Sequence, residues 1–323
     1  MKKSEMQEAA RILQDGRSFL VVGHISPDGD SIGCLCALGL SLQGLGKSVL
    51  LISPDGVPEV YRFLPGSERV LKEVPPNQHF DIGLIVDCEN SGRLGSAAEA
   101  MKSCRKTVEI DHHPGGERSS DVQLVDSSAA SCGEIVFELL LKAGVETSPD
   151  VAECLLTAII TDTGCFRFSS VKPSTLRTAA DLLERGASIS KIIRKVYETR
   201  PLSSAKLLGA ALSTLETAAH GRIAYASITR EQMASAQAGD TEGEGIVNYI
   251  RSVRGAQVGI LFREEADGTT RVSLRSGDRL DISQVARLFG GGGHRTAAGC
   301  TLDRPLTEAM DLVLGAVQKW MAF

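Results

Sequence analysis

Short apolar runs alternate with longer segments of helical periodicity along the first part of the chain. The runs that are typical of strands are nearly continuous in Val, Ile and Leu, and they cover residues 18–23, 47–53, 80–86, 107–110 and 122–125. Helices are expected between them at residues 28–46 and near residues 97–103. Strands of this kind that alternate with helices predict a parallel sheet covered on both faces.

The pattern changes twice further along the chain. Helical periodicity dominates from residue 131, with candidate helices at residues 132–143, 151–160, 175–185 and 189–198, and a further one at 202–219 after Pro201. Strands return at residues 222–228, 257–263 and 271–275, with helices at 282–289 and about 306–320. We therefore expect an N-terminal α/β domain at residues 1–198, a helical linker at 199–220 and a smaller α/β domain at 221–323.

Composition limits the class of protein. With 42% hydrophobic residues and 23% charged residues, the chain is typical of globular proteins. No apolar run reaches the roughly 18 residues of a membrane span, and the polar N-terminus has no signal-peptide pattern, so we expect a cytoplasmic protein with no membrane partner. The eight cysteines form no CxxC pair, which favours reduced thiols over a zinc or redox motif.

The net charge of −5 argues against long duplex nucleic acid as a partner, because proteins that bind it usually carry a basic surface. Nine arginines and no lysine nevertheless fall between Arg251 and Arg304. They form either a local anion-binding surface or a set of solvated side chains on a two-sided sheet.

The first candidate site motif follows the first predicted strand. It places His24, Asp28 and Asp30 within seven residues. Ligands bind beyond the carboxyl ends of strands in open α/β sheets, and neighbouring carboxylates repel one another unless a cation compensates them. Capping of the following helix is the alternative interpretation, but it explains one aspartate and not the whole group.

Three further motifs carry the same residue types. Asp87 ends a predicted strand and is weak evidence alone, whereas Asp111, His112 and His113 directly follow another strand. Neighbouring side chains of an extended segment point in different directions, so one histidine can bind metal while the other faces substrate. Asp162 lies at the end of a predicted apolar helix, and by itself it is an ordinary residue for a helix C-terminus.

Taken together, these motifs predict a centre for two divalent cations. A parallel sheet brings the ends of successive strands into one crevice, and the donors are carboxylates and imidazoles without thiolates. Such donors suit ions such as manganese better than a structural zinc, and the carboxylates exceed the need of one ion. Paired metal ions are a usual device for hydrolysis of phosphate esters.

In this order, HISPDGD, the strand-end aspartate, DHH and TDTG resemble the DHH phosphoesterase superfamily. The later segments SLRS and FGGGGHRTAAG resemble the DHHA1 domain that many members carry, so the resemblance covers nearly the whole chain. The stand-alone branch of nanoRNases and pAp phosphatases is the most similar one. This resemblance implies an active site in the cleft between a DHH domain and a DHHA1 domain. Cys34 departs from the pattern, where a serine-like residue is expected, and we expect it to affect helix packing.

The resemblance also implies roles for the matching residues. One metal would be held by His24 and Asp28, the other by Asp30, His112 and Asp162, and Asp87 would bridge both. Of the remaining two, His113 would contact the scissile phosphate and help to protonate the leaving group, and Asp111 would orient the histidines.

A glycine run in the second half supplies the candidate substrate contacts. Four glycines alone are typical of a flexible linker, but glycine also lets the backbone approach a ligand and cradle an anion. By resemblance this loop reaches across the cleft to the substrate. The candidate contacts are Gly291, Gly292, Gly293, His294, Arg295 and Arg275, with Asn248 and Arg93 as weaker ones.

The resulting hypothesis is a phosphoric ester hydrolase. By resemblance it would hydrolyse nanoRNA, dinucleotides and 3′-phosphoadenosine 5′-phosphate to mononucleotides, using two divalent cations, with Mn²⁺ ahead of Mg²⁺ or Co²⁺. The alternatives are a phosphodiesterase for c-di-AMP or pApA and a non-enzymatic nucleotide sensor. A RecJ-like exonuclease would need more basic charge, and the GGGGH loop argues against a pyrophosphatase. A homodimer is possible.

Overall fold

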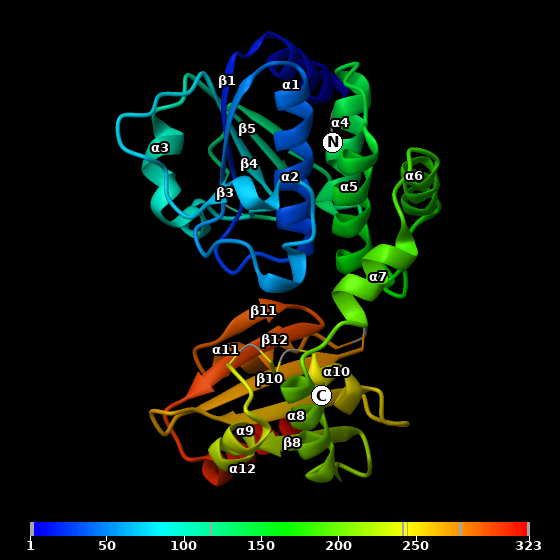
Figure 1. Cartoon of the computed structure of the whole chain (residues 1–323). Helices are drawn as coiled ribbons and strands as arrows, with labels where there is room; N and C mark the ends of the chain where they lie inside the picture. Colours follow the sequence, from blue (N-terminus) through cyan, green and yellow to red (C-terminus); the bar gives the residue numbers. More distant parts are fainter. Residues whose placement is uncertain (1–2, 117, 241, 244, 278–279, 322–323) are drawn as a thin grey trace. The chain divides into compact units, whose positions relative to one another are not determined.

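The computed structural model describes residues 3–116, 118–240, 242–243, 245–277 and 280–321, without the side chain of His294. The chain divides into two compact units, Met1–Thr199 and Arg200–Phe323. Each unit has its own six-stranded sheet and its own buried apolar clusters (Figure 1). None of the helices in the described ranges combines the length and the apolarity that a membrane crossing requires.

The sheet of the first unit is parallel throughout, which confirms the α/β prediction. Its order is β3-β2-β1-β4-β5-β6. The strands are β1 (Ser18–Val22), β2 (Ser48–Ile52), β3 (Val70–Leu71), β4 (Ile82–Val86), β5 (Lys106–Asp111) and β6 (Val122–Val125). The order reverses between β1 and β4, and the crevice beyond the carboxyl ends of strands at such a point is where open α/β sheets bind ligands.

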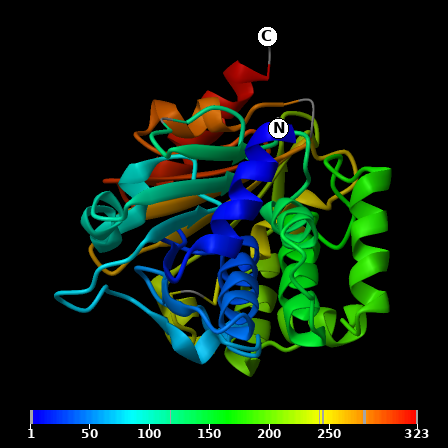
Figure 2. The same ribbon diagram turned by 90° about the horizontal axis from the view of Figure 1, so that it is seen from above.

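Both faces of this sheet are buried. Phe19 and Val21 of β1 pack into the larger apolar cluster, whereas Leu20 and Val22 pack into the smaller one on the other face. The larger cluster includes α1 (Lys3–Asp15), α2 (Gly29–Gly44), α4 (Cys132–Lys142) and α5 (Pro149–Asp162); the smaller one includes the 3-10 helix η3 (Ser91–Ala97) and α3 (Ala98–Lys102). Figures 1 and 2 show α2, α4 and α5 side by side.

Helices α2 and α5 pack very closely. A Cβ atom on Gly33 would lie 2.5 Å from the carbonyl oxygen of Cys154, so a larger residue would force these helices apart. This approach brings Asp162, the last residue of α5, toward the first turn of α2. The unit is completed by α6 (Pro173–Glu184), α7 (Ile189–Tyr197) and the short 3-10 helices η1 (Glu59–Tyr61) and η2 (Ser67–Arg69).

The second unit has a mixed sheet. Its order is β11-β12-β10-β9-β8-β7, and β8 and β9 are its parallel pair. The strands are β7 (Glu216–Ala218), β8 (Ile223–Ile228), β9 (Val258–Glu264), β10 (Thr270–Ser276), β11 (Gly292–His294) and β12 (Ala297–Leu302). The prediction of a single helix over residues 202–219 is wrong at its end, because α8 (Leu202–Ser213) stops before β7.

Helices cover the two faces of this sheet unequally. On one face, α11 (Ser283–Leu288) and α12 (Leu306–Trp320) pack against alternate residues of β9, β10 and β12. On the other face, α8, α9 (Arg230–Ala236) and α10 (Ile246–Arg251) form an apolar cluster with residues of β8 and with Leu261 of β9. That second cluster contains no residue of β10 or β12, so this part of the sheet is available to line a pocket.

Candidate functional site

The residues predicted to bind metal are brought together in the first unit. His24 follows β1, Asp87 follows β4, and His112 follows β5. Potential ligand atoms lie within 4.8 Å of one another in three groups, namely His24, Asp28 and Asp87; Asp30, His112 and Asp162; and Asp87, His112 and His113. The first two groups contain the two sets that the family resemblance implied. Asp87 belongs to the first group, and its Oδ1 lies 3.7 Å from His112 Nε2 of the second.

Asp87 is the centre of this arrangement. Its side chain is 1% exposed, and neither carboxylate oxygen has a hydrogen-bond partner among the described residues. Imidazole nitrogens of His24, His112 and His113 lie 3.4, 3.7 and 3.6 Å from those oxygens. Burial, and then the charges of Asp30 and Asp28, raise the pKa of Asp87 well above its usual range. A buried carboxylate without hydrogen bonds is costly unless a cation compensates it.

The backbone at Asp87 is also unusual. Its φ angle is +55°, in the left-handed region that few residues other than glycine adopt. Strain of this kind persists where the surrounding structure enforces it, which is frequent at functional sites.

His24 and Asp28 form the group next to Asp87. Asp28 caps α2, since its Oδ1 accepts hydrogen bonds from the backbone N–H groups of Asp30 and Ser31. The capping interpretation of the first motif is therefore confirmed for Asp28, and the same Oδ1 atom lies 3.9 Å from His24 Nε2. Burial lowers the pKa of His24, which favours the neutral imidazole that binds metal.

Arg93 lies behind His24. A guanidinium nitrogen of Arg93 is 2.8 Å from His24 Nδ1 and 3.2 Å from the carbonyl oxygen of Ile25, which is itself 2.7 Å from Nδ1. If Nε2 bound a cation, Nδ1 would carry the proton and donate it to the Ile25 carbonyl oxygen. Arg93 would then donate only to that carbonyl, because a protonated Nδ1 cannot accept from the guanidinium. Arg93 thus contacts a candidate ligand, a role that the sequence did not suggest.

Asp30 is fixed by the start of α4. Its carboxylate accepts hydrogen bonds from Ser131 Oγ at 2.9 Å, Cys132 N at 2.7 Å and Gly133 N at 3.0 Å. The positive end of the helix dipole stabilises a carboxylate at this place. Sequence reasoning missed these contacts because they join residues about one hundred positions apart. Cys34 is fully buried, as expected for helix packing, and its thiol also contacts Asp30 at 3.5 Å.

His112 and Asp162 complete the second group. His112 Nε2 lies 3.4 Å from Asp162 and 3.7 Å from Asp30. Burial, and then the charges of Asp30 and Asp28, raise the pKa of Asp162 to about 9. Without a cation, this carboxyl therefore keeps its proton near neutral pH.

A buried ionic chain supports the DHH segment. Asp111 Oδ1 lies 2.8 Å from His113 Nδ1 and accepts the backbone N–H groups of His112 and His113. Arg118 donates to the other oxygen of Asp111 at 2.7 Å and also pairs with the buried Glu109. Although burial opposes the effect, the hydrogen bonds from His113 and Arg118 lower the pKa of Asp111 to about 2. Sequence analysis missed Glu109 and Arg118; a glutamate inside an apolar strand was the available signal.

These residues fit a pair of divalent cations. The donors are carboxylate oxygens and imidazole nitrogens, which suit such ions. Asp28, Asp30, Asp87 and Asp162 would together carry more negative charge than a single dication neutralises. Asp87, with two oxygens lacking hydrogen bonds, is the residue that two ions could share.

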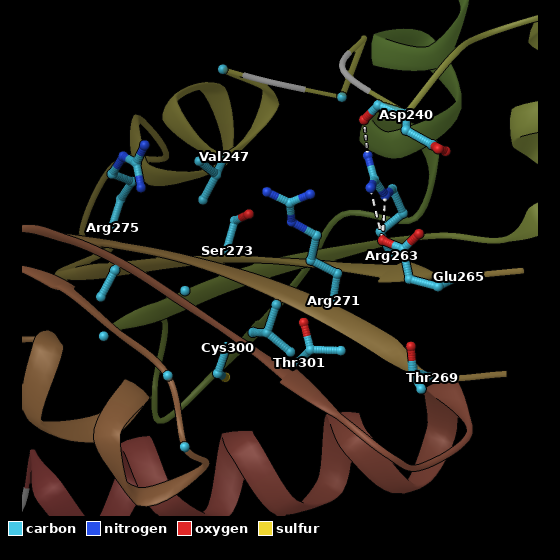
Figure 3. Close-up of a pocket in the computed structure, with 18 of the residues that line it drawn as sticks. Asp240, Val247, Arg263, Glu265, Thr269, Arg271, Ser273, Arg275, Cys300 and Thr301 are labelled. Atoms are coloured by element: carbon cyan, nitrogen blue, oxygen red, sulfur yellow. Dashed lines mark hydrogen bonds and ion pairs between the residues drawn. The ribbon is translucent and has the colours of Figure 1, made fainter. Parts of the chain in front are cut away.

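A second candidate region is a pocket of the second unit, with a volume of about 1140 Å³ (Figure 3). Four predicted substrate contacts, Arg275, Asn248, Gly291 and Gly292, line it. Gly293 and Arg295 are absent from its lining, Arg93 belongs to the first unit, and the side chain of His294 is outside the described residues.

The glycine run is more ordered than the expected loop. Gly292–His294 form the edge strand β11, paired with β12. A Cβ atom on Gly291 would lie 2.1 Å from the carbonyl oxygen of Gly299, so only glycine permits this close approach to β12. The linker interpretation of the run is therefore wrong.

Comparison with known proteins gives a consistent result. Residues 18–159 match the DHH family, N-terminal domain, and residues 220–322 match the DHHA1 domain. A Thermus thermophilus relative named bifunctional oligoribonuclease and PAP phosphatase NrnA is 32% identical, covering 98% of this chain and 94% of its own length. A Bacillus subtilis relative of the same name is 28% identical, covering 86% of this chain and 87% of its own length.

A solved structure gives the same architecture over the whole chain. The structure of an exopolyphosphatase-related protein from Bacteroides fragilis matches with a TM-score of 0.94 at 26% sequence identity, covering 99% of this chain and 97% of that one. Because both domain models match in order and the Thermus relative aligns with nearly the entire chain, this protein belongs to the DHH family and carries a DHHA1 domain.

Proposed function

We propose that this protein is a metal-dependent phosphoesterase that hydrolyses short oligoribonucleotides and 3′-phosphoadenosine 5′-phosphate to mononucleotides. The names of the Thermus and Bacillus relatives, each an oligoribonuclease and PAP phosphatase, support this substrate class. Mn²⁺ is the proposed metal, because the donor set mixes imidazoles with carboxylates.

Asp87 is the observation that carries the proposal. A buried carboxylate with two oxygens that lack hydrogen bonds, facing three imidazoles, is poorly explained as a structural element. It is well explained as a ligand shared by two cations. We assign His24 and Asp28 to one cation and Asp30, His112 and Asp162 to the other.

The chemistry follows from these assignments. Held by these residues, two divalent cations would lower the pKa of a water molecule and would supply hydroxide near neutral pH. Asp111 accepts a hydrogen bond from His113 Nδ1 and thereby directs the Nε2 edge of this ring away from itself. Although burial opposes the effect, the hydrogen bond and charge of Asp111 raise the pKa of His113. His113 can therefore hold the proton that the departing ribose oxygen needs.

The second unit supplies the proposed substrate contacts. Arg275 lines the pocket beside Gly291, Gly292 and Asn248. A guanidinium recognises phosphate oxygens through a fixed fork of donors, and backbone amides near glycine can approach the same anion.

A substrate panel tests the function. We would measure phosphate and mononucleotide release, with Mn²⁺ and with chelator, from 3′-phosphoadenosine 5′-phosphate, pApA, c-di-AMP, a five-nucleotide RNA, a 24-nucleotide RNA and pyrophosphate. We expect Mn²⁺-dependent turnover of the bisphosphate and the short RNAs, lost in Asp87→Asn. Asp181→Asn on the exposed surface of α6 is the matched control.

The alternatives give different results on this panel. Preferred turnover of c-di-AMP or pApA would move the function to a dinucleotide phosphodiesterase. Tight nucleotide binding without any turnover would contradict the proposal and favour a nucleotide sensor.

A further inference from the structure

The pocket floor in the second unit carries a row of polar side chains on β10. Val272 and Leu274 face the apolar cluster with α11 and α12. Successive side chains of a strand point to opposite faces, so Arg271, Ser273 and Arg275 face the other way and line the pocket. Figure 3 shows these three side chains following one another along the strand.

Arg271 is the least compensated charge of this row. It lies directly opposite Arg263 on β9, and like charges in this position are unfavourable. Glu265 accepts hydrogen bonds from Arg263 at 2.7 and 3.0 Å and so compensates that arginine. Within the described part of the chain, no carboxylate lies at ion-pair distance from Arg271, and its side chain is exposed. An exposed guanidinium beside a second arginine attracts an anion.

The spacing of the row fits a nucleotide chain. Alternate residues of a strand are roughly 6.6 Å apart, because the rise per residue is about 3.3 Å. This distance is close to the separation of successive phosphates in an extended single strand. Arg275, Ser273 and Arg271 therefore offer donors at about the repeat of such a strand. The volume of about 1140 Å³ also exceeds the usual range for pockets that bind single small molecules.

The far end of the pocket has the opposite character. Asp240, Glu265 and Asp267 line it beyond Arg271. Glu265 pairs with Arg263, but no ion pair within the described ranges engages the side chains of Asp240 or Asp267. Two uncompensated carboxylates repel any phosphate that extends past Arg271.

We propose that Arg275, Ser273 and Arg271 bind successive phosphates of a short oligonucleotide, and that Asp240 and Asp267 limit the length of the strand that this pocket accepts. The inference rests on the proposed function and adds to it a residue that selects for length. It identifies the longest occupant as a single strand of a few nucleotides, of which the bisphosphate fills only the part near Arg275.

Arg271→Ala is the first test. We would measure KM and kcat for Mn²⁺-dependent hydrolysis of RNAs of two to six nucleotides. Loss of one charge-assisted phosphate contact is expected to raise KM about 5- to 10-fold for the tetranucleotide, with less than about a twofold change for the dinucleotide. The kcat values should stay within about twofold. The matched control is Arg254→Ala, at an exposed arginine that does not line the pocket. It should leave KM unchanged for both the tetranucleotide and the dinucleotide.

The acidic end is tested by a pair of changes that removes both carboxylate charges and keeps the shape of the side chains. Asp267 Oδ1 accepts hydrogen bonds from Thr269 N and Oγ1, and asparagine retains that acceptor. The backbone carbonyl of Asp240 contacts Arg263 and is unaffected by a side-chain change. Asp240→Asn combined with Asp267→Asn should lower KM about threefold for the five- and six-nucleotide RNAs. Asp303→Asn, on an exposed loop outside the pocket, should not.

Calorimetric binding of the same RNAs to chelated protein separates the two proposals. If the unchanged protein turns over these RNAs and Arg271→Ala changes KM equally for all lengths, the length inference is overturned and the proposed function stands. Absent turnover with length-dependent binding that is lost in Arg271→Ala would overturn the function and support the strand-binding row. Absence of both turnover and binding would overturn both.

Discussion

The two candidate regions of this protein are built in opposite ways. In the first unit, Asp30, Asp87 and Asp111 are almost fully buried, and two of them are fixed by several hydrogen bonds each. In the second unit, Arg271 lies exposed on an open part of a sheet. Buried carboxylates suit a centre that holds cations rigidly, at a cost in stability when the cations are absent. Exposed donors suit a surface that adjusts to a substrate.

Asp87→Asn should give the largest contrast between the regions. Asparagine tolerates the left-handed backbone at this position, so the change removes the charge without adding strain. We expect kcat to fall about 1,000-fold or more, with loss of one or both bound metal ions by elemental analysis. Retention of both ions and of most activity would remove Asp87 from the centre.

Arg118→Met tests how far the first site depends on its buried support. The change leaves Asp111 and Glu109 buried without their cation, and we expect the free energy of unfolding to fall by about 3–5 kcal/mol. The kcat value should fall about 10- to 100-fold, because Asp111, which orients His113, loses the guanidinium that fixes it. Urea denaturation checks the first value. Arg105→Met, which removes an exposed ion pair with Asp81, should cost less than about 1 kcal/mol.

The buried carboxylates predict an unusual pH dependence of the metal-free protein. Asp162 has a folded-state pKa of about 9, far above its unfolded value, so its contribution to stability is lost as pH rises toward 9. The lowered pKa of His24 acts in the opposite sense, and its contribution is lost as pH falls below about 6.5. Between about pH 7 and 8, chelated protein should therefore lose stability with rising pH.

Mn²⁺ should remove this loss, because cation binding displaces the protons. Thermal unfolding with and without chelator measures the difference, and Asp162→Asn should flatten the slope of the chelated protein. A chelated protein that gains stability over the same pH range would contradict the burial argument.

Arg275→Ala should have a smaller effect of a different kind. We expect KM for 3′-phosphoadenosine 5′-phosphate to rise about 10-fold while kcat changes much less, since the change removes binding of ground state and transition state alike. Steady-state kinetics make this comparison directly. A fall in kcat as large as that of Asp87→Asn would show that the second region takes part in the chemistry. The two regions would then not divide into a chemical centre and a binding surface.

Cys34→Ser is expected to have the smallest effect. A hydroxyl can donate to Asp30 as the thiol does, in nearly the same volume. The free energy of unfolding should change by less than about 2 kcal/mol, and kcat by less than about twofold. A large loss of activity would show that the thiol tunes Asp30 beyond packing.

The sequence predicted the parts of the fold that have a local signal. Apolar strands marked the parallel sheet, and the motifs after β1, β4 and β5 marked the candidate ligands. The helix α1 had such a signal as well, since its buried residues Met6, Ala9, Ala10 and Leu13 have helical spacing. The polar composition of this segment hides that spacing, so sequence analysis missed the helix.

Other features have no local signal. The contact between Asp30 and Ser131 depends on how α2 and α4 pack, and the pairing of Glu109 with Arg118 depends on a loop returning to β5. The short helices α9 and α10 fall below the length at which periodicity is distinct. Which strands line the pocket depends on which strands the helices leave uncovered, and this is a result of tertiary packing alone.

The short strand β11 has a consequence for self-association. The second sheet has β11 at one edge and β7 at the other, and each has three residues. Edges this short, one of them built largely from glycine, are poor templates for backbone pairing with another molecule. Copies of this chain at high concentration should therefore resist sheet-to-sheet aggregation through these edges, and any stable dimer would have to bury a different surface.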